Sequence, residues 1–301
     1  MLIPNLDALF APLGASTFFA EYYENRPLHL RAEHDERQGL LSHDELLQAL
    51  AVANALPADI VCFPEHMGTT KAELSANPAL LAEYLDAGHP LVWNRARGVS
   101  ARIDALSALL ANAFGGHVWP NVYATGAAGT PFDMHFDAHE VIAIHCAGEK
   151  TWDISNVRVN RPIEAVEMES AIARTLRTRR DEAARNISNT FTVCPGDLVY
   201  IPRGQFHNAR TLSGRSLHVT FGIELPSGFD LVKRIVLEVL ANPVFREYAP
   251  PVAMDPGGQR ALAWYEDVAS QLKKVGSSEA LASTREELRR VWERKSRGED
   301  T

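Results

Sequence analysis

The sequence is poor in the features that mark secreted or membrane-spanning proteins. Its three cysteines, Cys62, Cys146 and Cys194, are far apart and form no Cys-x-x-Cys pair. We therefore expect buried free thiols in a reducing, cytoplasmic setting rather than disulfides or a zinc site. No uncharged apolar run reaches about eighteen residues, so no membrane-spanning helix is expected. Residues 1–16 have no basic start and carry Asp7 in their apolar part, which does not fit a signal peptide.

An excess of positive charge is also absent. The chain has 30 Lys and Arg residues against 38 Asp and Glu residues, which gives a formal net charge of -8 at pH 7. Neither nucleic acid nor an anionic membrane is therefore expected as a partner. With 301 residues, of which 46% are hydrophobic, the chain can form one large domain, alone or with a smaller appendage.

The region up to about residue 115 has mainly helical patterns with short extended pieces. Residues 42–56 begin with a Ser42 N-cap and Glu45 three residues later, followed by an apolar stripe at helical spacing. A similar pattern over residues 101–116 ends at a glycine pair, which favours a helix end. Short strands are predicted within 26–32 and 89–94.

From about 117 to 225 the pattern changes to short β-branched and aromatic segments separated by Gly or Pro turns. Several short strands with such turns are typical of a barrel or sandwich. Residues 164–186 interrupt them with a charged segment that we expect to be a helix, its arginines forming a solvated face. Beyond 227, helical patterns return over 229–242, 257–275 and 277–296.

We therefore predict an α+β protein with two parts. Residues 1–226 form the main domain, with a β core over about 117–226, and residues 227–301 form a small helical appendage. The apolar positions of 229–240 and the helix that contains Trp264 exceed what is needed to cover one end of a barrel. We predict from them a homodimer built partly from the appendage.

Polar side chains are concentrated at the start of a predicted strand in the sequence MHFDAHEVIAIHCAGEKTWDI, residues 134–154. Alternate residues of a strand share a face, so a regular strand would turn one set inward: His135, Asp137, His139, Val141, Ala143 and His145. Buried polar groups of this kind need compensation, and a metal ion is one form of it. Glu140 falls on the opposite face, where we expect it to support the ligands or to have a structural role.

A third candidate ligand lies near residue 207. Gly196, Pro202, Gly204 and His207 reproduce in full the second cupin motif, Gly-x5-Pro-x-Gly-x2-His. Upstream, Gly129-x5-His135-x-Asp137 fits the first cupin motif, with Asp in place of its second His. The resulting set of His135, Asp137 and His207 is the two-His, one-carboxylate arrangement of non-heme Fe(II) oxygenases. His139 is expected to contact these ligands or a substrate rather than the metal.

With these motifs, the chain resembles the JmjC-type, cupin-4 branch of Fe(II)- and 2-oxoglutarate-dependent oxygenases, which includes ribosomal-protein hydroxylases. The resemblance covers about residues 15–225 and extends to FFAEYYENRPLHLRA (18–32), YLDAGHPLVWN (84–94), NVYAT (121–125) and PRGQFHNARTLSGRSLHVTFG (202–222). It implies a double-stranded β-helix, or jelly roll, as the core of the fold.

The resemblance also implies residue roles. His135, Asp137 and His207 match the iron ligands, and Lys150 matches the cation that pairs with the distal carboxylate of 2-oxoglutarate. Without the resemblance, Lys150 would be read as an exposed turn lysine. Further matches to positions near the cosubstrate are Asn121, Tyr123, His218 and Thr220.

The implied activity consumes 2-oxoglutarate and O2, releases succinate and CO2, and hydroxylates a C–H bond of an amino-acid side chain. The substrate is a protein or peptide, a free amino acid or a natural-product precursor, because no winged-helix pattern of the ribosomal hydroxylases follows the barrel. N-demethylation by the same chemistry remains an alternative. Two further alternatives are a non-catalytic cupin acting as sensor or scaffold, and a metal cupin that needs no 2-oxoglutarate. Neither of these two requires a buried cation at Lys150.

Overall fold

The computed structural model describes residues 2–33, 37–52, 59–62, 70, 73, 77–126, 133–163, 179–211, 214–275, 286, 290, 291 and 294. Contacts divide the chain into two compact units, residues 1–114 with 118–224 and residues 115–117 with 225–301. That the parts on either side of residue 226 are independent domains stays a prediction.

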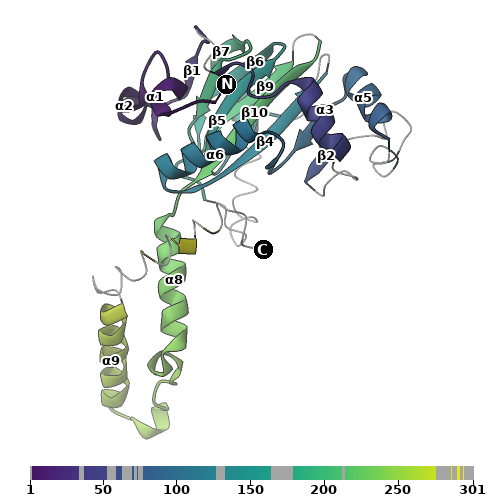
Figure 1. The fold of residues 1–301 in the computed structure, drawn as a ribbon. Coiled ribbons are helices and arrows are strands. Elements are labelled where there is room, and N and C mark those ends of the chain that lie inside the picture. Colours follow the sequence, from purple (N-terminus) through teal and green to yellow (C-terminus); the bar gives the residue numbers. More distant parts are fainter. Residues whose placement is uncertain are drawn as a thin grey trace. The chain divides into compact units, whose positions relative to one another are not determined.

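Two antiparallel sheets form the core of the first unit (Figure 1). In the described residues, the larger sheet has the strand order β1-β8-β5-β10-β4-β3-β2 and the smaller has the order β7-β6-β9. The strands are β1 Leu28–Leu30, β2 Ile60–Cys62, β3 Leu91–Trp93, β4 His117–Thr125, β5 Glu140–Ala147, β6 Lys150–Arg158, β7 Ile187–Val193, β8 Leu198–Ile201, β9 Gln205–Thr211 and β10 Ser216–Glu224.

Apolar side chains from both sheets pack together between them. One cluster joins Val141 and Ala143 of β5 to Trp152 and Ile154 of β6, and Val199 of β8 adds to it. β5 lies between β8 and β10, and its first six residues are buried. Its nearly continuous apolar sequence is typical of such a buried strand. This packing gives the predicted jelly-roll core its rigid centre.

Two features of the strands differ from expectation. The ladder of β5 begins at Glu140 and not at residue 134, because the chain bends at residues 138 and 139 and, before them, His135 forms only an isolated bridge to His207. The predicted strands also omitted β2 and β9. β9 begins directly after the turn at Pro202–Gly204. The second motif predicted this turn and His207, but strand propensity did not indicate a strand here.

The helices of the first unit come from the N-terminal part of the chain, before β4. The predicted helix over 101–116 is α6, and the capping box predicted at residue 42 is present in α3. The Ser42 amide donates to Glu45 Oε2 (2.8 Å) and the Glu45 amide donates to Ser42 Oγ (3.2 Å). The helices of this unit are α1 Leu6–Leu9, α2 Ala15–Thr17, the π-helix η1 Phe18–Tyr22, α3 His43–Val52, α5 Pro78–Asp86 and α6 Ala101–Phe114.

Some predicted segments fall on residues that the structure does not describe. These are the end of the helix predicted over 42–56, residues 164–178 of the charged segment, most of 277–296, and Gly129 of the first motif. Residues 179–185 of the charged segment are helical as expected.

The cysteines are all free, as predicted, but their expected burial is wrong for Cys194. This residue is exposed, whereas Cys62 and Cys146 are half-buried. Cys194 follows β7 at the turn that leads to Gly196, and a turn at the end of a strand places its side chains near solvent.

The second unit consists mainly of α8 Gly228–Ala241 and α9 Gln259–Val275, with short 3-10 turns η5 Pro243–Arg246 and η6 Val252–Met254. Several apolar side chains of the two helices are exposed, among them Val232, Leu237, Leu240, Leu262 and Tyr265. The predicted homodimer would cover such residues and stays a prediction. Of the helices that the structure describes, none has the length and hydrophobicity needed to cross a bilayer.

Gly204 of the second motif occupies a position that only glycine fits. Its φ is +79°, and a Cβ there would lie 2.0 Å from the carbonyl oxygen of Val159. Gly214 has a similar φ of +65°, but no described atom lies within 4 Å of its Cβ position.

We predict that Gly204→Ala destabilises the protein more than Gly214→Ala. Both variants place alanine in the left-handed region, at about 1–2 kcal/mol, and only the first adds overpacking, typically about 1–3 kcal/mol. Urea unfolding followed by circular dichroism measures the difference. Equal losses of stability would show that the contact with Val159 does not constrain this turn.

Candidate metal centre

A cavity of ≈ 200 Å³ lies between the two sheets. It is lined by side chains of β4, β5 and β10 from the larger sheet and of β6 and β9 from the smaller. All eight site residues predicted from the sequence line it: Asn121, Tyr123, His135, Asp137, Lys150, His207, His218 and Thr220. His139, Val141, Trp152 and Ala209 complete the lining.

The two motifs are joined to each other through the backbone. The amide of His135 donates to the carbonyl of His207 (3.0 Å), and the amide of His207 donates to the carbonyl of His135 (2.7 Å). The amide of Gly204 donates to the carbonyl of Asp137 (2.7 Å). Residues 72 positions apart in the sequence, 207 minus 135, are thus held as one short antiparallel pair.

The imidazoles of His135 and His207 are oriented by hydrogen bonds on the ring nitrogen that faces away from the centre. Nδ1 of His135 donates to the carbonyl of Asp133 (2.8 Å), and Nδ1 of His207 donates to the carbonyl of Gln205 (2.9 Å). The tautomer so fixed has its proton on Nδ1 and its lone pair on Nε2, the atom through which an imidazole of this tautomer binds a metal.

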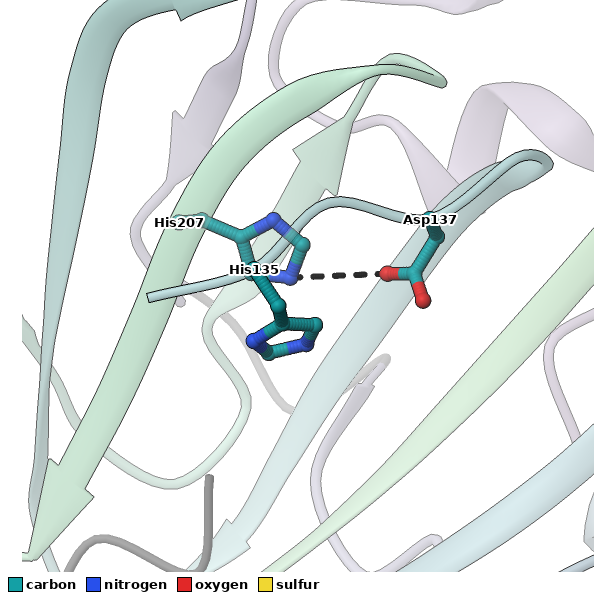
Figure 2. Close-up of side chains that lie close together, drawn as sticks. All are labelled: His135, Asp137 and His207. Atoms are coloured by element: carbon teal, nitrogen blue, oxygen red, sulfur yellow. Dashed lines mark ion pairs between the residues drawn. The ribbon is translucent and has the colours of Figure 1, made fainter. Parts of the chain in front are cut away.

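These nitrogens and the carboxylate of Asp137 converge. Nε2 of His207 lies 3.5 Å from Oδ2 of Asp137, and one ligand atom from each of the three residues lies within 4.8 Å of the others. Figure 2 shows the ring of His135 beside that of His207, with Asp137 facing them. The ring centroids of the two histidines are 4.5 Å apart.

The protonation states suit metal binding. Burial, together with the charge of nearby His135, lowers the pKa of His207 to about 4, so this imidazole is neutral at pH 7. Burial acts to raise the pKa of Asp137, but the neighbouring His207, His139 and His135 outweigh it and the pKa lies below its usual value. Two imidazoles and one carboxylate are the donor set that Fe(II) takes in oxygenases, so the residues present fit this metal.

Lys150 begins β6 and its side chain is fully buried. Its Nζ donates to Nδ1 of His218 at 3.2 Å, and within the described residues it forms no ion pair with a carboxylate. Burial lowers the pKa of Lys150 to about 7. A buried amine that faces a cavity without a counter-charge is suited to bind an anionic ligand.

The remaining predicted residues surround this amine and the triad. The ring of Tyr123 stacks on that of His218, with centroids 4.7 Å apart and an interplanar angle of 5°. Burial, and then the charge of Asp137, raise the pKa of Tyr123, which keeps the phenol neutral. Oδ1 of Asn121 accepts a hydrogen bond from the amide of Arg95 (2.9 Å).

Glu140 lies outside the cavity lining, as the alternation of the strand predicts. Its carboxyl group is buried and accepts a hydrogen bond from the hydroxyl of Tyr200. Nε of Arg203 lies 3.9 Å from Oε1 of Glu140. Burial raises the pKa of Glu140, and a structural role for this residue fits the geometry.

Sequence reasoning placed Val141 on the inward face but did not identify the other apolar residues of the cavity wall. Trp152 and Ala209 each lie two positions after a predicted residue, Lys150 and His207, so the two-residue period of a strand would have indicated them. The ring of Trp152 lies 5.8 Å from that of His207 at an angle of 21°. It closes one side of the centre with apolar surface.

We predict that His135→Ala and His207→Ala abolish metal binding while the fold persists, because each removes one of three ligands. Calorimetric titration with anaerobic Fe(II) or with Co(II) measures the affinity. Loss of a residue that only supports the ligands typically costs about 10- to 100-fold, and we expect His139→Ala to remain within that range. Wild-type metal affinity in either ligand variant would contradict the assignment.

Comparison with known proteins agrees with this geometry. Residues 95–231 match the family model of the JmjC domain. The chain is 24% identical over 270 residues to ribosomal oxygenase 2 of Bos taurus, covering 85% of this chain and 54% of that protein. It is 27% identical over 239 residues to the bifunctional lysine-specific demethylase and histidyl-hydroxylase NO66 of Caenorhabditis elegans, covering 77% of this chain and 31% of that protein. The chain thus spans about half or less of the length of these two relatives.

A structural comparison confirms the predicted fold. The structure of YcfD, a ribosomal oxygenase from Escherichia coli, in complex with cobalt and 2-oxoglutarate, matches with a TM-score of 0.56 at 14% identity. The match covers 88% of this chain and 67% of that one. Residues 95–231 of this chain are thus similar to the JmjC domain, and the chain has the jelly-roll fold that its sequence predicts.

Proposed function

We propose that the chain is an Fe(II)- and 2-oxoglutarate-dependent oxygenase that hydroxylates an amino-acid side chain of a protein or peptide. The observation that carries the proposal is one cavity with two complementary parts. It contains a convergent two-His, one-carboxylate set, and it contains a buried lysine whose charge no described carboxylate compensates. A metal and a dicarboxylate together satisfy both.

His135, Asp137 and His207 would hold the iron in this proposal, and the three leave further coordination positions for cosubstrate and O2. Bound iron supplies the activation of O2 that oxidation of a C–H bond requires. The chain contributes the orientation of its ligands through the paired backbones of residues 135 and 207. The buried walls formed by Val141 and Trp152 keep water from the reacting groups.

Lys150 would bind the distal carboxylate of 2-oxoglutarate. The neutral ring of His218 accepts its hydrogen bond and lies stacked against Tyr123, so the amine is held in one position. Burial, and then the charge of Lys150, hold the pKa of His218 well below its usual value, which keeps this ring an acceptor. Thr220 and Asn121 line the same cavity and are proposed as further polar contacts of the cosubstrate.

The relatives support a protein substrate. Ribosomal oxygenases and a histidyl-hydroxylase are among the proteins that this chain is similar to. The name of the nematode relative also includes lysine demethylation, so N-demethylation is the second candidate. The two differ in product, because hydroxylation leaves an oxygen atom on the substrate whereas demethylation releases formaldehyde.

The test is incubation of the full chain with Fe(II), 2-oxoglutarate and O2, with a mixture of ribosomal proteins as probe. We expect succinate in amounts that depend on active protein, and one added oxygen atom in the mass of a probe protein. The variant Asp137→Ala serves as the matched control. Wild-type protein that forms no succinate under these conditions would exclude the proposed activity.

We predict that Lys150→Ala weakens 2-oxoglutarate binding by roughly 30-fold to several thousand-fold. The range follows from the roughly 2–5 kcal/mol lost when one partner of a buried charge pair is removed. Metal affinity should change little, because the triad is untouched. Calorimetric titration of the anaerobic Mn(II) protein measures both. If Lys150→Ala binds 2-oxoglutarate as wild type does, another group holds the carboxylate.

The affinity should also depend on pH. Burial lowers the pKa of Lys150 to about 7, and a bound carboxylate must raise it. Binding is therefore strongest below pH 7 and weakens as the pH rises above 7, with uptake of up to one proton. From pH 7 to pH 8.5 we expect a fall of roughly 15-fold.

Titrations in two buffers of different ionisation enthalpy measure this proton uptake. Lys150→Arg is the matched control, because a guanidinium stays charged over this range. Its affinity should be weaker than that of wild type at pH 7 but nearly independent of pH. A pH-independent wild-type affinity would show that Lys150 does not bind the anion.

A further inference from the structure

A closed ring of polar contacts lies beside the turn at Pro202–Gly204, and none of its residues belongs to the cavity lining. The amide of Glu24 donates to the hydroxyl of Tyr200 (2.8 Å), and that hydroxyl donates to Oε2 of Glu140. Nη2 of Arg203 donates to Oε1 of Glu24 (2.6 Å), and Nε of Arg203 lies 3.9 Å from Oε1 of Glu140. The ring thus joins the N-terminal segment to β5, β8 and the turn itself.

Arg203 is held between two acidic side chains. Its own side chain is 22% exposed and that of Glu140 is 3% exposed. Nε of Arg203 and Oε1 of Glu140 are both buried and have no hydrogen-bond partner among the described residues. Each of these charges is therefore compensated at this point by the other, and moving one would leave the other buried and unpaired. This cost favours a single position of the guanidinium.

Glu24 has a backbone conformation that is unfavourable for its residue type. Its φ is +53°, in the left-handed region that glycine favours. The ring fixes this conformation on both sides of the Cα atom, because the amide binds Tyr200 and the carboxylate binds Arg203. Strained backbone persists only where its surroundings determine it, and such positions are concentrated at functional sites. The strain at Glu24 therefore points to a role beyond the connection of η1 to β1.

The peptide unit between Arg203 and Gly204 connects this ring to the metal ligands. Its carbonyl accepts a hydrogen bond from Nε of Arg158 (3.1 Å), and its amide donates to the carbonyl of Asp137 (2.7 Å). Because a peptide unit is planar, a shift of Arg203 that tilts it moves the carbonyl and the amide together. The backbone position of Asp137, which carries the ligand carboxylate, therefore depends on where Arg203 is held.

Resting on the metal centre of the proposed function, we propose that Glu24 and Arg203 are positioning residues of that centre. Glu24 holds the guanidinium of Arg203 on one side and Glu140 holds it on the other. Arg203 in turn fixes the peptide unit that binds Asp137. The contact between Glu24 and Arg203 spans 179 positions of the sequence. The N-terminal segment thus takes part in the metal centre without touching the metal.

The test measures the affinity for Co(II) by calorimetric titration, and the visible absorption of the bound Co(II), which reports on the arrangement of its ligands. We expect Arg203→Ala to weaken binding about 10-fold, the lower end of the range for residues that support metal ligands. Its Co(II) absorption should also differ from that of wild type. Arg203→Lys keeps the charge but not the planar fork of donors, and should recover part of the affinity.

A double variant shows whether Glu24 acts through Arg203. Glu24→Ala should weaken Co(II) binding when Arg203 is present and should have no further effect in the Arg203→Ala background. Such non-additivity is the signature of residues that act through one contact. Where Arg203→Ala does not fold, Arg203→Lys takes its place, and the effect of Glu24→Ala should be smaller there than in wild type.

Arg102 offers a matched control. It too joins a carboxylate, that of Glu45, to a backbone carbonyl, that of Leu40 (3.2 Å), but it links α6 to α3 and does not line the cavity. Arg102→Ala should lower the midpoint of urea unfolding and leave both the affinity for Co(II) and its absorption unchanged. This comparison separates the positioning of ligands from a general loss of stability.

Wild-type affinity and absorption in Arg203→Ala and Glu24→Ala would overturn the inference. So would additive losses in the double variant, or an equal loss of affinity in Arg102→Ala. Wild-type protein that binds no Co(II) would instead exclude the metal centre of the proposed function, and this inference with it.

Discussion

The pairing of His135 with His207 is the contact on which the rest of the site depends. Two backbone hydrogen bonds bring together His135 and His207, which are far apart in the sequence. A third, from the amide of Gly204 to the carbonyl of Asp137, holds the residue that carries the carboxylate. Because these bonds involve the main chain, the positions of the three ligands do not depend on the metal to assemble them. The left-handed backbone of Gly204 is what allows β9 to begin at the required point.

The cavity then combines two charges of different origin. At one end lies a carboxylate between imidazoles, and at the other lies Lys150, buried without a carboxylate partner in the described residues. A buried charge without a partner is unfavourable, and burial accordingly lowers the pKa of this amine to about 7. An anion bound beside Lys150 stabilises the charged form of the amine. The unfavourable burial of this amine therefore contributes to the affinity for an anion.

The sequence predicted which side chains meet at the site better than it predicted their local structure. The two cupin motifs singled out His135, Asp137 and His207, and the structure brings one potential ligand atom of each within 4.8 Å of the others. The strand assumed to carry the first two ligands begins only at Glu140, and the segment before it is held by non-local backbone hydrogen bonds, from His135 to His207 and from Gly204 to Asp137. Propensity over a short window does not contain that contact.

Local sequence patterns also failed to predict side-chain burial and contacts at other positions. Cys194 was expected inside and is exposed, because its position is set by the turn after β7 and not by its own hydrophobicity. The stacking of Tyr123 on His218 joins β4 to β10, and only the order of strands in the sheet makes them neighbours. Side-chain contacts across a sheet of this kind follow from topology, which the sequence indicated through its resemblance to a known fold rather than through periodicity.

The central claim is that one atom of O2 enters the succinate formed from 2-oxoglutarate in this cavity, and that the other enters a C–H bond of the substrate. The most direct measurement is incubation of the Fe(II) protein with 2-oxoglutarate under 18O2, followed by mass spectrometry of the succinate. The account predicts that each succinate formed gains one 18O atom in its new carboxylate, at a rate that falls to background in Asp137→Ala. Succinate without label, or label that forms equally in the variant, would contradict it.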